Sequence, residues 1–131
     1  GTSIKDVLEF AGGVAEDASE IIFGGPMMGV DAENDSGVIE KRTNAITVMK
    51  EELKPPTVTP CIRCGRCARA CPMNLYPASV EAAVNHGLTE SLNNLNVNYC
   101  MECGSCSYVC PAKRPLTQVM RLAKAQLRRE K

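Results

Sequence analysis

The stretch that decides the fold is a cysteine motif that occurs twice. The first copy reads Cys61-Ile-Arg-Cys64-Gly-Arg-Cys67-Ala-Arg-Ala-Cys71-Pro72. The second reads Cys100-Met-Glu-Cys103-Gly-Ser-Cys106-Ser-Tyr-Val-Cys110-Pro111, and together the two copies hold all 8 cysteines of the 131-residue chain. Both copies follow the spacing C-x2-C-x2-C-x3-C-P. The region from Cys61 to Pro111 is therefore an internal repeat built around eight thiols.

This spacing is typical of bacterial ferredoxins that bind two [4Fe–4S] clusters. Three thiolates at every third position let a tight loop wrap three corners of a cubane, and Gly65 and Gly104 keep the backbone close to the sulfides. The fourth cysteine comes one helical turn after the third, so it is predicted to point toward the other cluster, and the proline after it turns the chain away. We expect one cluster on Cys61, Cys64, Cys67 and Cys110, and the other on Cys100, Cys103, Cys106 and Cys71.

Two other uses of eight cysteines fit less well. Four disulfides would suit a small secreted domain, but no signal-peptide pattern opens the chain, and paired repeats are not a disulfide pattern. Two zinc sites would use separated C-x2-C pairs, which would leave the middle cysteine of each C-x2-C-x2-C without a role. His86, the one histidine, is expected at a helix end, because eight cysteines already complete two cubanes.

The net charge of zero hides an asymmetry between the two parts of the chain. Residues 1–53 carry eleven Asp and Glu against four Lys and Arg, whereas residues 54–131 carry four against eleven. A cubane with four thiolates carries about −2, so part of the basic excess balances the clusters and nucleic-acid binding is not expected. No apolar run approaches the length of a membrane span.

Residues 1–53 are predicted to hold one helix and two strands. Ile4, Val7, Leu8 and Ala11 share a helical face, with Thr2 or Ser3 as the cap and glycines 12–13 as the end. Residues 20–23 and 43–49 are predicted strands, and residues 31–37 an acidic loop. These elements make a poor domain alone, so we expect part of it to lie upstream.

The segment Gly24-Gly25-Pro26-Met27-Met28-Gly29 between these elements is predicted to be a tight turn. Its glycine spacing differs from the dinucleotide fingerprint, and Pro26 removes an amide that a phosphate would need. We expect the turn to pack Met27 and Met28 into a core.

The proline-rich residues 54–60 are predicted to form an extended linker, and residues 61–131 a helical domain. Helices are expected from Pro77 or Ser79 to Gly87, from Thr89, and from Pro115. Twenty-eight residues separate Cys71 from Cys100, which exceeds the hairpins of a minimal β-type ferredoxin. The last helix is predicted to bury one stripe and to expose a basic surface. The stripe is Leu116, Val119, Met120, Ala123 and Leu127; the basic surface is Arg121, Lys124, Arg128 and Arg129.

Taken together, these segments resemble the C-terminal part of the C subunit of the Rnf (Rsx) electron-transport complex. The resemblance rests on G-T-S-I-K-D-V-L-E-F-A-G-G, I-I-F-G-G-P-M-M-G-V, K-P-P-T-V-T-P-C-I-R-C-G-R-C, the second cysteine run and P-L-T-Q-V-M-R-L-A-K-A. It implies an α+β chain in which residues 1–53 are part of a soluble-ligand-binding β-grasp module and residues 61–131 are an α-helical two-cluster ferredoxin domain. A cobalamin reductase of propanediol metabolism, which shares the G-G-P-M-M-G turn, is the alternative.

The expected function is outer-sphere electron transfer by a fragment that is not catalytic alone. The resemblance implies other subunits of a membrane complex and a redox protein as partners, at the cytoplasmic face of the membrane. FMN and NADH belong to the family's upstream region. A scaffold whose clusters are structural is the competing hypothesis.

The cations beside the cysteines either raise the cluster potentials or only balance charge. They are Arg63, Arg66, Arg69, Lys113 and Arg114.

Overall fold

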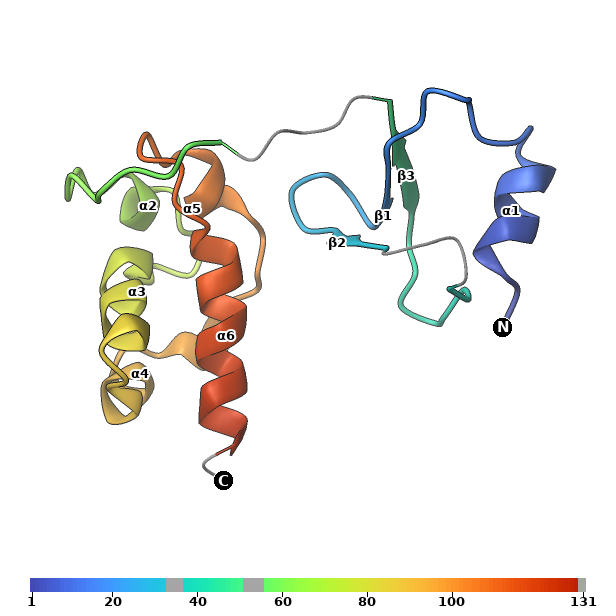
Figure 1. Cartoon of the computed structure of the whole chain (residues 1–131). Coiled ribbons are helices and arrows are strands. Elements are labelled where there is room, and N and C mark those ends of the chain that lie inside the picture. The colour runs from blue at the N-terminus through green and yellow to red at the C-terminus, as the bar shows by residue number, and fades with distance from the viewer. Residues whose placement is uncertain (33–36, 51–55, 130–131) are drawn as a thin grey trace. The chain divides into compact units, whose positions relative to one another are not determined.

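The computed structural model describes residues 1–32, 37–50 and 56–129. The chain forms two compact units, residues 1–55 and 56–131, both drawn in Figure 1. Lys54 and Pro55 of the predicted linker lie outside the described residues. The described end of that linker is part of the second unit, since the amide of Thr59 donates to the carbonyl of Ala112 at 3.0 Å.

In the first unit, helix α1 (Ile4–Phe10) forms where the sequence predicts it. The Oγ of Ser3 accepts a hydrogen bond from the amide of Asp6, 3.0 Å away, which caps the helix. Ile4 is fully buried. Gly12 and Gly13 follow the helix with φ of +108° and +84°, a conformation that ends helices and favours glycine.

A three-stranded antiparallel sheet completes this unit, in the order β2-β1-β3. Its strands are β1 (Glu20–Phe23), β2 (Val30–Asp31) and β3 (Ile46–Met49). The central Ile22 pairs with Asp31 on one side and with Thr47 on the other. The sequence predicted only β1 and β3. It missed β2 because two residues are too few to show an alternating pattern, and it placed the start of β3 three residues early. Residues 33–36 of the predicted acidic loop lie outside the described residues.

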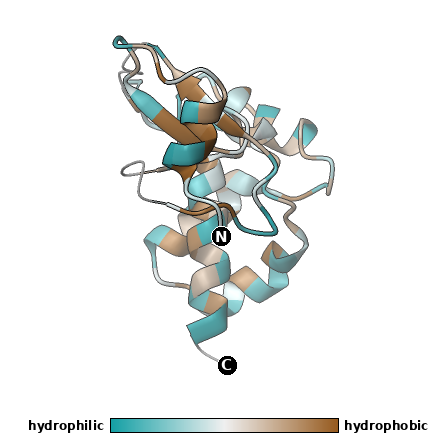
Figure 2. Ribbon diagram, turned by 90° about the vertical axis from the view of Figure 1, so that its right-hand side faces the viewer, coloured by the Kyte–Doolittle hydropathy of each residue, from teal (hydrophilic) through white to brown (hydrophobic). Residues whose placement is uncertain are grey.

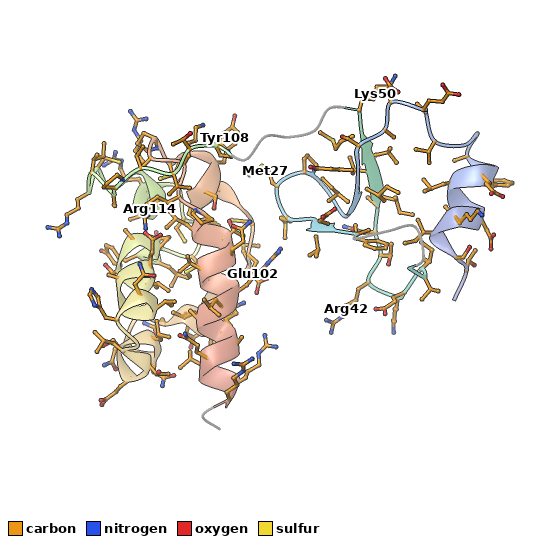
Figure 3. The ribbon with its side chains drawn as sticks, viewed as in Figure 1. Met27, Arg42, Lys50, Glu102, Tyr108 and Arg114 are labelled. Atoms are coloured by element: carbon orange, nitrogen blue, oxygen red, sulfur yellow. The ribbon has the colours of Figure 1, made fainter. Side chains whose placement is uncertain are left out.

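The turn between β1 and β2 differs from its prediction. Met27 and Met28 are 47% and 49% exposed, so the expected core packing is wrong; Met27 lies at the tip of the loop (Figure 3). Gly29 is the residue that the turn needs, because a Cβ there would overlap the Ile22 side chain and lie 2.7 Å from the carbonyl of Gly25. With the backbone of Gly29 pressed against β1, the methionine side chains point outward.

The second unit is helical. Its elements are α2 (Arg66–Arg69), α3 (Pro77–Asn85), α4 (Thr89–Asn94), the 3-10 helix η1 (Val97–Tyr99), α5 (Ser105–Tyr108) and α6 (Leu116–Arg129). Helices α3 and α6 lie side by side, with α2 and α5 together at one end (Figure 1). His86 is exposed at the C-terminal end of α3. No helix in the described part of the chain is long and apolar enough to cross a membrane.

The core of this unit lies between α3, α4, η1 and α6. Val80, Leu92 and Val97 are fully buried, and Met120 is 1% exposed. The apolar stripe predicted for α6 faces this core, with Val119 half-buried and its other members buried. The end of α6 near the C-terminus is hydrophilic (Figure 2), as expected from Arg128 and Arg129.

The two cysteine motifs carry the same backbone. Helices α2 and α5 begin at equivalent positions of the two copies, and so do α3 and α6. The unusual φ angles also recur at equivalent positions: Gly65 and Gly104 at +72° and +83°, Arg63 and Glu102 at +53° and +58°, Asn74 and Lys113 at +53° and +52°. The sequence repeat is therefore a structural repeat that extends from the first cysteine to the following helix.

Candidate metal centres

Two cavities in the second unit are each lined by four cysteines. Site A is lined by Cys61, Cys64, Cys67 and Cys110. Site B is lined by Cys71, Cys100, Cys103 and Cys106. Each cavity takes three thiols from one motif and the fourth from the other, because the short helix that contains the third cysteine carries the fourth away from its own loop. The structure thus brings together the two sets that the spacing predicts; ligation of iron by them stays a prediction.

The donor sets fit a cubane cluster better than a single metal ion. Among the described residues, no group of three or more His, Cys, Asp or Glu side chains is placed to hold one ion. A tetrahedral zinc site would need four sulfurs about 2.3 Å from one point. Four cysteines in each of two cavities, in the C-x2-C-x2-C-x3-C-P spacing, is the ligand set of two [4Fe–4S] clusters.

The loop that begins each motif directs an amide at its first cysteine. The N–H of Arg63 donates to the Sγ of Cys61 at 3.4 Å, and the N–H of Glu102 donates to the Sγ of Cys100 at 3.3 Å. Both donors have left-handed φ angles, and it is this conformation that turns the amide back. A hydrogen bond to sulfur favours the thiolate, which is the form that binds metal.

Site B is the more enclosed of the two. Its four cysteines are half-buried, and burial raises the pKa of Cys100 and of Cys106. The Ser105 hydroxyl, 3.4 Å from the Sγ of Cys103, lowers the pKa of that thiol. Burial therefore disfavours the thiolate at Cys100 and Cys106, whereas the Ser105 hydroxyl favours it at Cys103.

Two basic side chains of helix α6, Arg121 and Lys124, form hydrogen bonds to the loop of site B. Lys124 donates to Glu102 at 2.8 Å and to the carbonyl of Cys100 at 2.6 Å, and Arg121 donates to Glu102 at 3.1 Å. The bond from Lys124 lowers the pKa of Glu102. Arg121 and Lys124 were predicted to line the outer basic surface. That prediction is wrong for Lys124, whose side chain is only 14% exposed, because Glu102 and the Cys100 carbonyl draw it inward.

Site A is more open and more basic. Cys61 and Cys64 are exposed, and the cavity is lined by Arg63, Arg66 and Arg114 as well as by its cysteines. These arginines are among the cations that the sequence placed beside the motif. Lys113 and Arg69 do not line this cavity, but both line a hollow beside Cys110.

An ion pair that the sequence did not indicate lies in the wall of site A. The Nε of Arg114 donates to both carboxylate oxygens of Glu81 at 2.8 and 2.7 Å, and its Nη1 donates to the carbonyl of Thr59 at 3.1 Å. Glu81 is only 5% exposed, and its hydrogen bond raises the pKa of Arg114. Arg114 therefore joins the start of the unit, helix α3 and the second motif around one cavity (Figure 3).

Two family models match the chain, and both are described as a 4Fe-4S dicluster domain. One matches residues 60–114 and contains all eight cysteines. The other matches residues 30–76, crosses from the first unit into the second, and contains only the first motif. The first match is the better guide to the cluster unit because it includes both cavities.

Curated relatives match nearly the whole chain. The C subunit of an ion-translocating oxidoreductase complex of Rhodobacter capsulatus is 41% identical over 97% of this chain and 25% of its own length. The C subunit of a proton-translocating ferredoxin:NAD(+) oxidoreductase complex of Clostridium ljungdahlii is 42% identical over 98% and 28%. The Na(+)-translocating counterpart of Acetobacterium woodii is 37% identical over 97% and 29%.

The chain thus spans between a quarter and a third of the length of these relatives. The matched part includes both units and both cysteine motifs, since it covers nearly every residue. The chain belongs to the family of C subunits of Rnf-type ion-translocating oxidoreductase complexes.

Proposed function

We propose that residues 56–131 bind two [4Fe–4S] clusters and relay electrons within an Rnf-type complex. The observation that carries this is the pair of cavities, each lined by four thiols drawn from both motifs. Site A would be held by Cys61, Cys64, Cys67 and Cys110, and site B by Cys71, Cys100, Cys103 and Cys106. A bound cluster supplies reversible one-electron exchange, which no amino-acid side chain at these sites supplies.

The protein itself positions the thiols, limits solvent access to the two sites and sets the electrostatic potential around them. The cysteine loops place the thiols and turn the amides of Arg63 and Glu102 onto sulfur. The core side chains Met120 and Pro77 close site B against water, and low solvent access lowers a cluster's reduction potential. At site A, exposed cysteines and cations favour the more negative reduced state, which raises the potential.

The parent protein's activity is an inference from its relatives' names. The relatives of Clostridium ljungdahlii and Acetobacterium woodii are named as subunits of ferredoxin:NAD(+) oxidoreductase complexes. We place the present segment between a redox partner and the parent's nucleotide chemistry, at the cytoplasmic face of the membrane and attached through other subunits. NADH and FMN would bind outside these residues, and residues 1–53 would be part of a β-grasp module. The cobalamin reductase alternative is not favoured, because the curated relatives reported above are C subunits of ion-translocating complexes.

The test is compositional and then functional. Protein purified anaerobically should contain about eight irons and eight sulfides per chain, as two cubanes require. Dithionite should bleach the cluster absorbance reversibly, and NADH alone should not, because a hydride carries two electrons and needs a flavin to divide them. A chain that binds two zincs and resists iron–sulfur reconstitution would overturn the proposal. Clusters that load but cannot be cycled would favour a structural role.

A further inference from the structure

The two copies of the motif can be compared position by position, which shows whether the cations of the first copy are required by the motif. Arg63, Arg66 and Arg69 occupy the positions that Glu102, Ser105 and Tyr108 occupy in the second copy of the motif. The backbone is the same at both places, since α2 and α5 begin at equivalent residues. The three arginines are therefore a property of the first copy and not of the motif in general.

The cations at the two sites differ in their ion pairs. Arg63, Arg66, Arg69 and Lys113 are all exposed, and none belongs to the four ion pairs found among the described residues. At site B, by contrast, Glu102 neutralises part of the charge of Arg121 and Lys124. The cations beside site B come from α6 and are held by Glu102, whereas those of the first motif are exposed.

The cations share their surface with exposed apolar groups. Arg66, Arg69 and Lys113 line a hollow with Tyr108, which is 75% exposed, and with Cys110 of site A. Ile62, between two ligand positions of site A, is 69% exposed. Figure 3 shows Tyr108 at the end of the unit where Figure 1 places α2 and α5. Arginine and aromatic side chains around a desolvated centre are the usual composition of a protein interface.

We propose that this cationic face, formed by Arg63, Arg66, Arg69, Lys113 and Tyr108, docks the acidic face of a one-electron redox protein. The proposal rests on the proposed function, and it makes site A the place where an electron enters or leaves the unit. Two of the four thiols of site A are exposed, whereas those of site B are all half-buried, so a docked partner approaches site A more closely. Complementary charge orients the partner and raises its encounter rate.

A matched pair of redox proteins tests the charge preference. Native cytochrome c is basic, and succinylated cytochrome c carries carboxylates in place of its lysines around the same haem. The complete parent protein is reduced with dithionite, freed of excess reagent and mixed with either cytochrome, so that one electron passes from the reduced parent protein to each ferric haem. We expect the succinylated form to be reduced ~10-fold faster at low ionic strength, with the preference vanishing at high salt.

Charge reversal at the face should invert this preference. The variant R63E/R66E/R69E should reduce native cytochrome c faster than the succinylated form. The control R128E/R129E reverses two exposed charges in the last turn of α6 and should keep the wild-type preference. If the wild type shows no preference, or if both variants change it equally, the docking face is wrong.

Binding provides a readout that does not depend on electron transfer. With the oxidised parent protein and the succinylated cytochrome, a carbodiimide should cross-link Lys113 to a partner carboxylate, and R63E/R66E/R69E should abolish this product. Iron content separates the two proposals: eight irons with no charge preference refute only the docking face, whereas missing clusters refute the proposed function. If charge reversal prevents cluster loading, R63Q/R66Q/R69Q replaces it and should reduce the preference ~3-fold or more.

Discussion

The two sites differ at one pair of equivalent positions in the repeat. Glu81 at site A is equivalent to Met120 near site B, and Arg114 at site A is equivalent to Leu75 near site B. At site A the buried Glu81 and the half-buried Arg114 form an ion pair in the cavity wall. At site B, Met120 lines the cavity and packs with Leu75 in the apolar core. One backbone therefore accepts either a charged or an apolar pair at the same place.

The difference separates what the repeat must keep from what it can change. Cysteines, the glycines before α2 and α5, and the left-handed residues recur at both sites, because they shape the loops. The surrounding side chains diverge. Site A keeps an ion pair in which burial of the Glu81 carboxylate costs desolvation energy. Arg114 also donates a third hydrogen bond, to the carbonyl of Thr59, which fixes the start of the unit.

The largest expected effect is the loss of one cluster, and it tests whether the motifs exchange their fourth cysteine. Cys71→Ala should remove the cluster of site B and leave that of site A, while Cys110→Ala should do the reverse, because each fourth cysteine lines the other motif's cavity. Each variant should retain about four irons. Electron paramagnetic resonance of the reduced variants identifies the surviving cluster. Self-contained motifs would give the opposite pattern and remove the basis of the comparison.

The next largest effect is on stability, and it tests whether site A can accept the apolar pair found near site B in place of its ion pair. Arg114→Leu leaves the buried carboxylate of Glu81 unpaired and should destabilise the unit by about 3 kcal/mol. The double variant Glu81→Met/Arg114→Leu copies the pair Met120 and Leu75, and should recover most of that loss, since an apolar pair of similar volume often replaces a buried ion pair without cost.

Anaerobic melting of the loaded variants, compared at one scan rate, measures both changes. The single variant should melt on the order of 10 °C below the wild type. The double variant should melt close to it. A double variant as unstable as the single one would mean that the bond from Arg114 to Thr59, and not the ion pair, stabilises site A.

The smallest effect uses two residues at equivalent positions with opposite charge. Arg63→Gln should lower the potential of site A, because it removes a cation that favours the reduced state. Glu102→Gln should raise the potential of site B, because it removes a negative charge that now offsets part of the charge of Arg121 and Lys124. Each shift should be on the order of 10–40 mV, since exposed charges contribute up to about 1 kcal/mol. A redox titration followed by electron paramagnetic resonance measures both, and shifts of the same sign would contradict the electrostatic account.

The cysteine spacing carried most of what could be predicted. Three intervening residues predict a turn of helix from the third to the fourth thiol, and the structure has α2 and α5 at the third cysteine of each motif. Helix α3 and the stripe of α6 were predicted from capping residues and from a period of 3.6. The strand β2 was missed because two residues carry no period, and Met27 was misplaced because an apolar side chain in a turn does not reveal which way the turn faces.

Contacts between distant residues were beyond the sequence pattern. Glu81 and Arg114 lie 33 residues apart, and Glu102 and Lys124 lie 22 apart. Neither pair has a helical or strand spacing, so nothing local links the partners. The internal repeat was the one signal available in the sequence. Where one copy has a charged residue and the other has an apolar residue at the equivalent position, the surroundings of the two sites must differ. Glu81 in the first copy and Met120 in the second are such a pair.

The sharing of cavities between motifs also has a consequence for synthesis of the chain. The N-terminal end leaves the ribosome first, so Cys61, Cys64 and Cys67 emerge well before Cys110, which closes the second motif. During that interval three thiols of site A are exposed without their fourth partner, and Cys71 waits for a loop that has not been made. Both cavities become complete within a few residues of each other, at Cys106 and Cys110. If the cavities hold clusters as proposed, the complete set of four thiols is available to iron and sulfide at either site only late in synthesis.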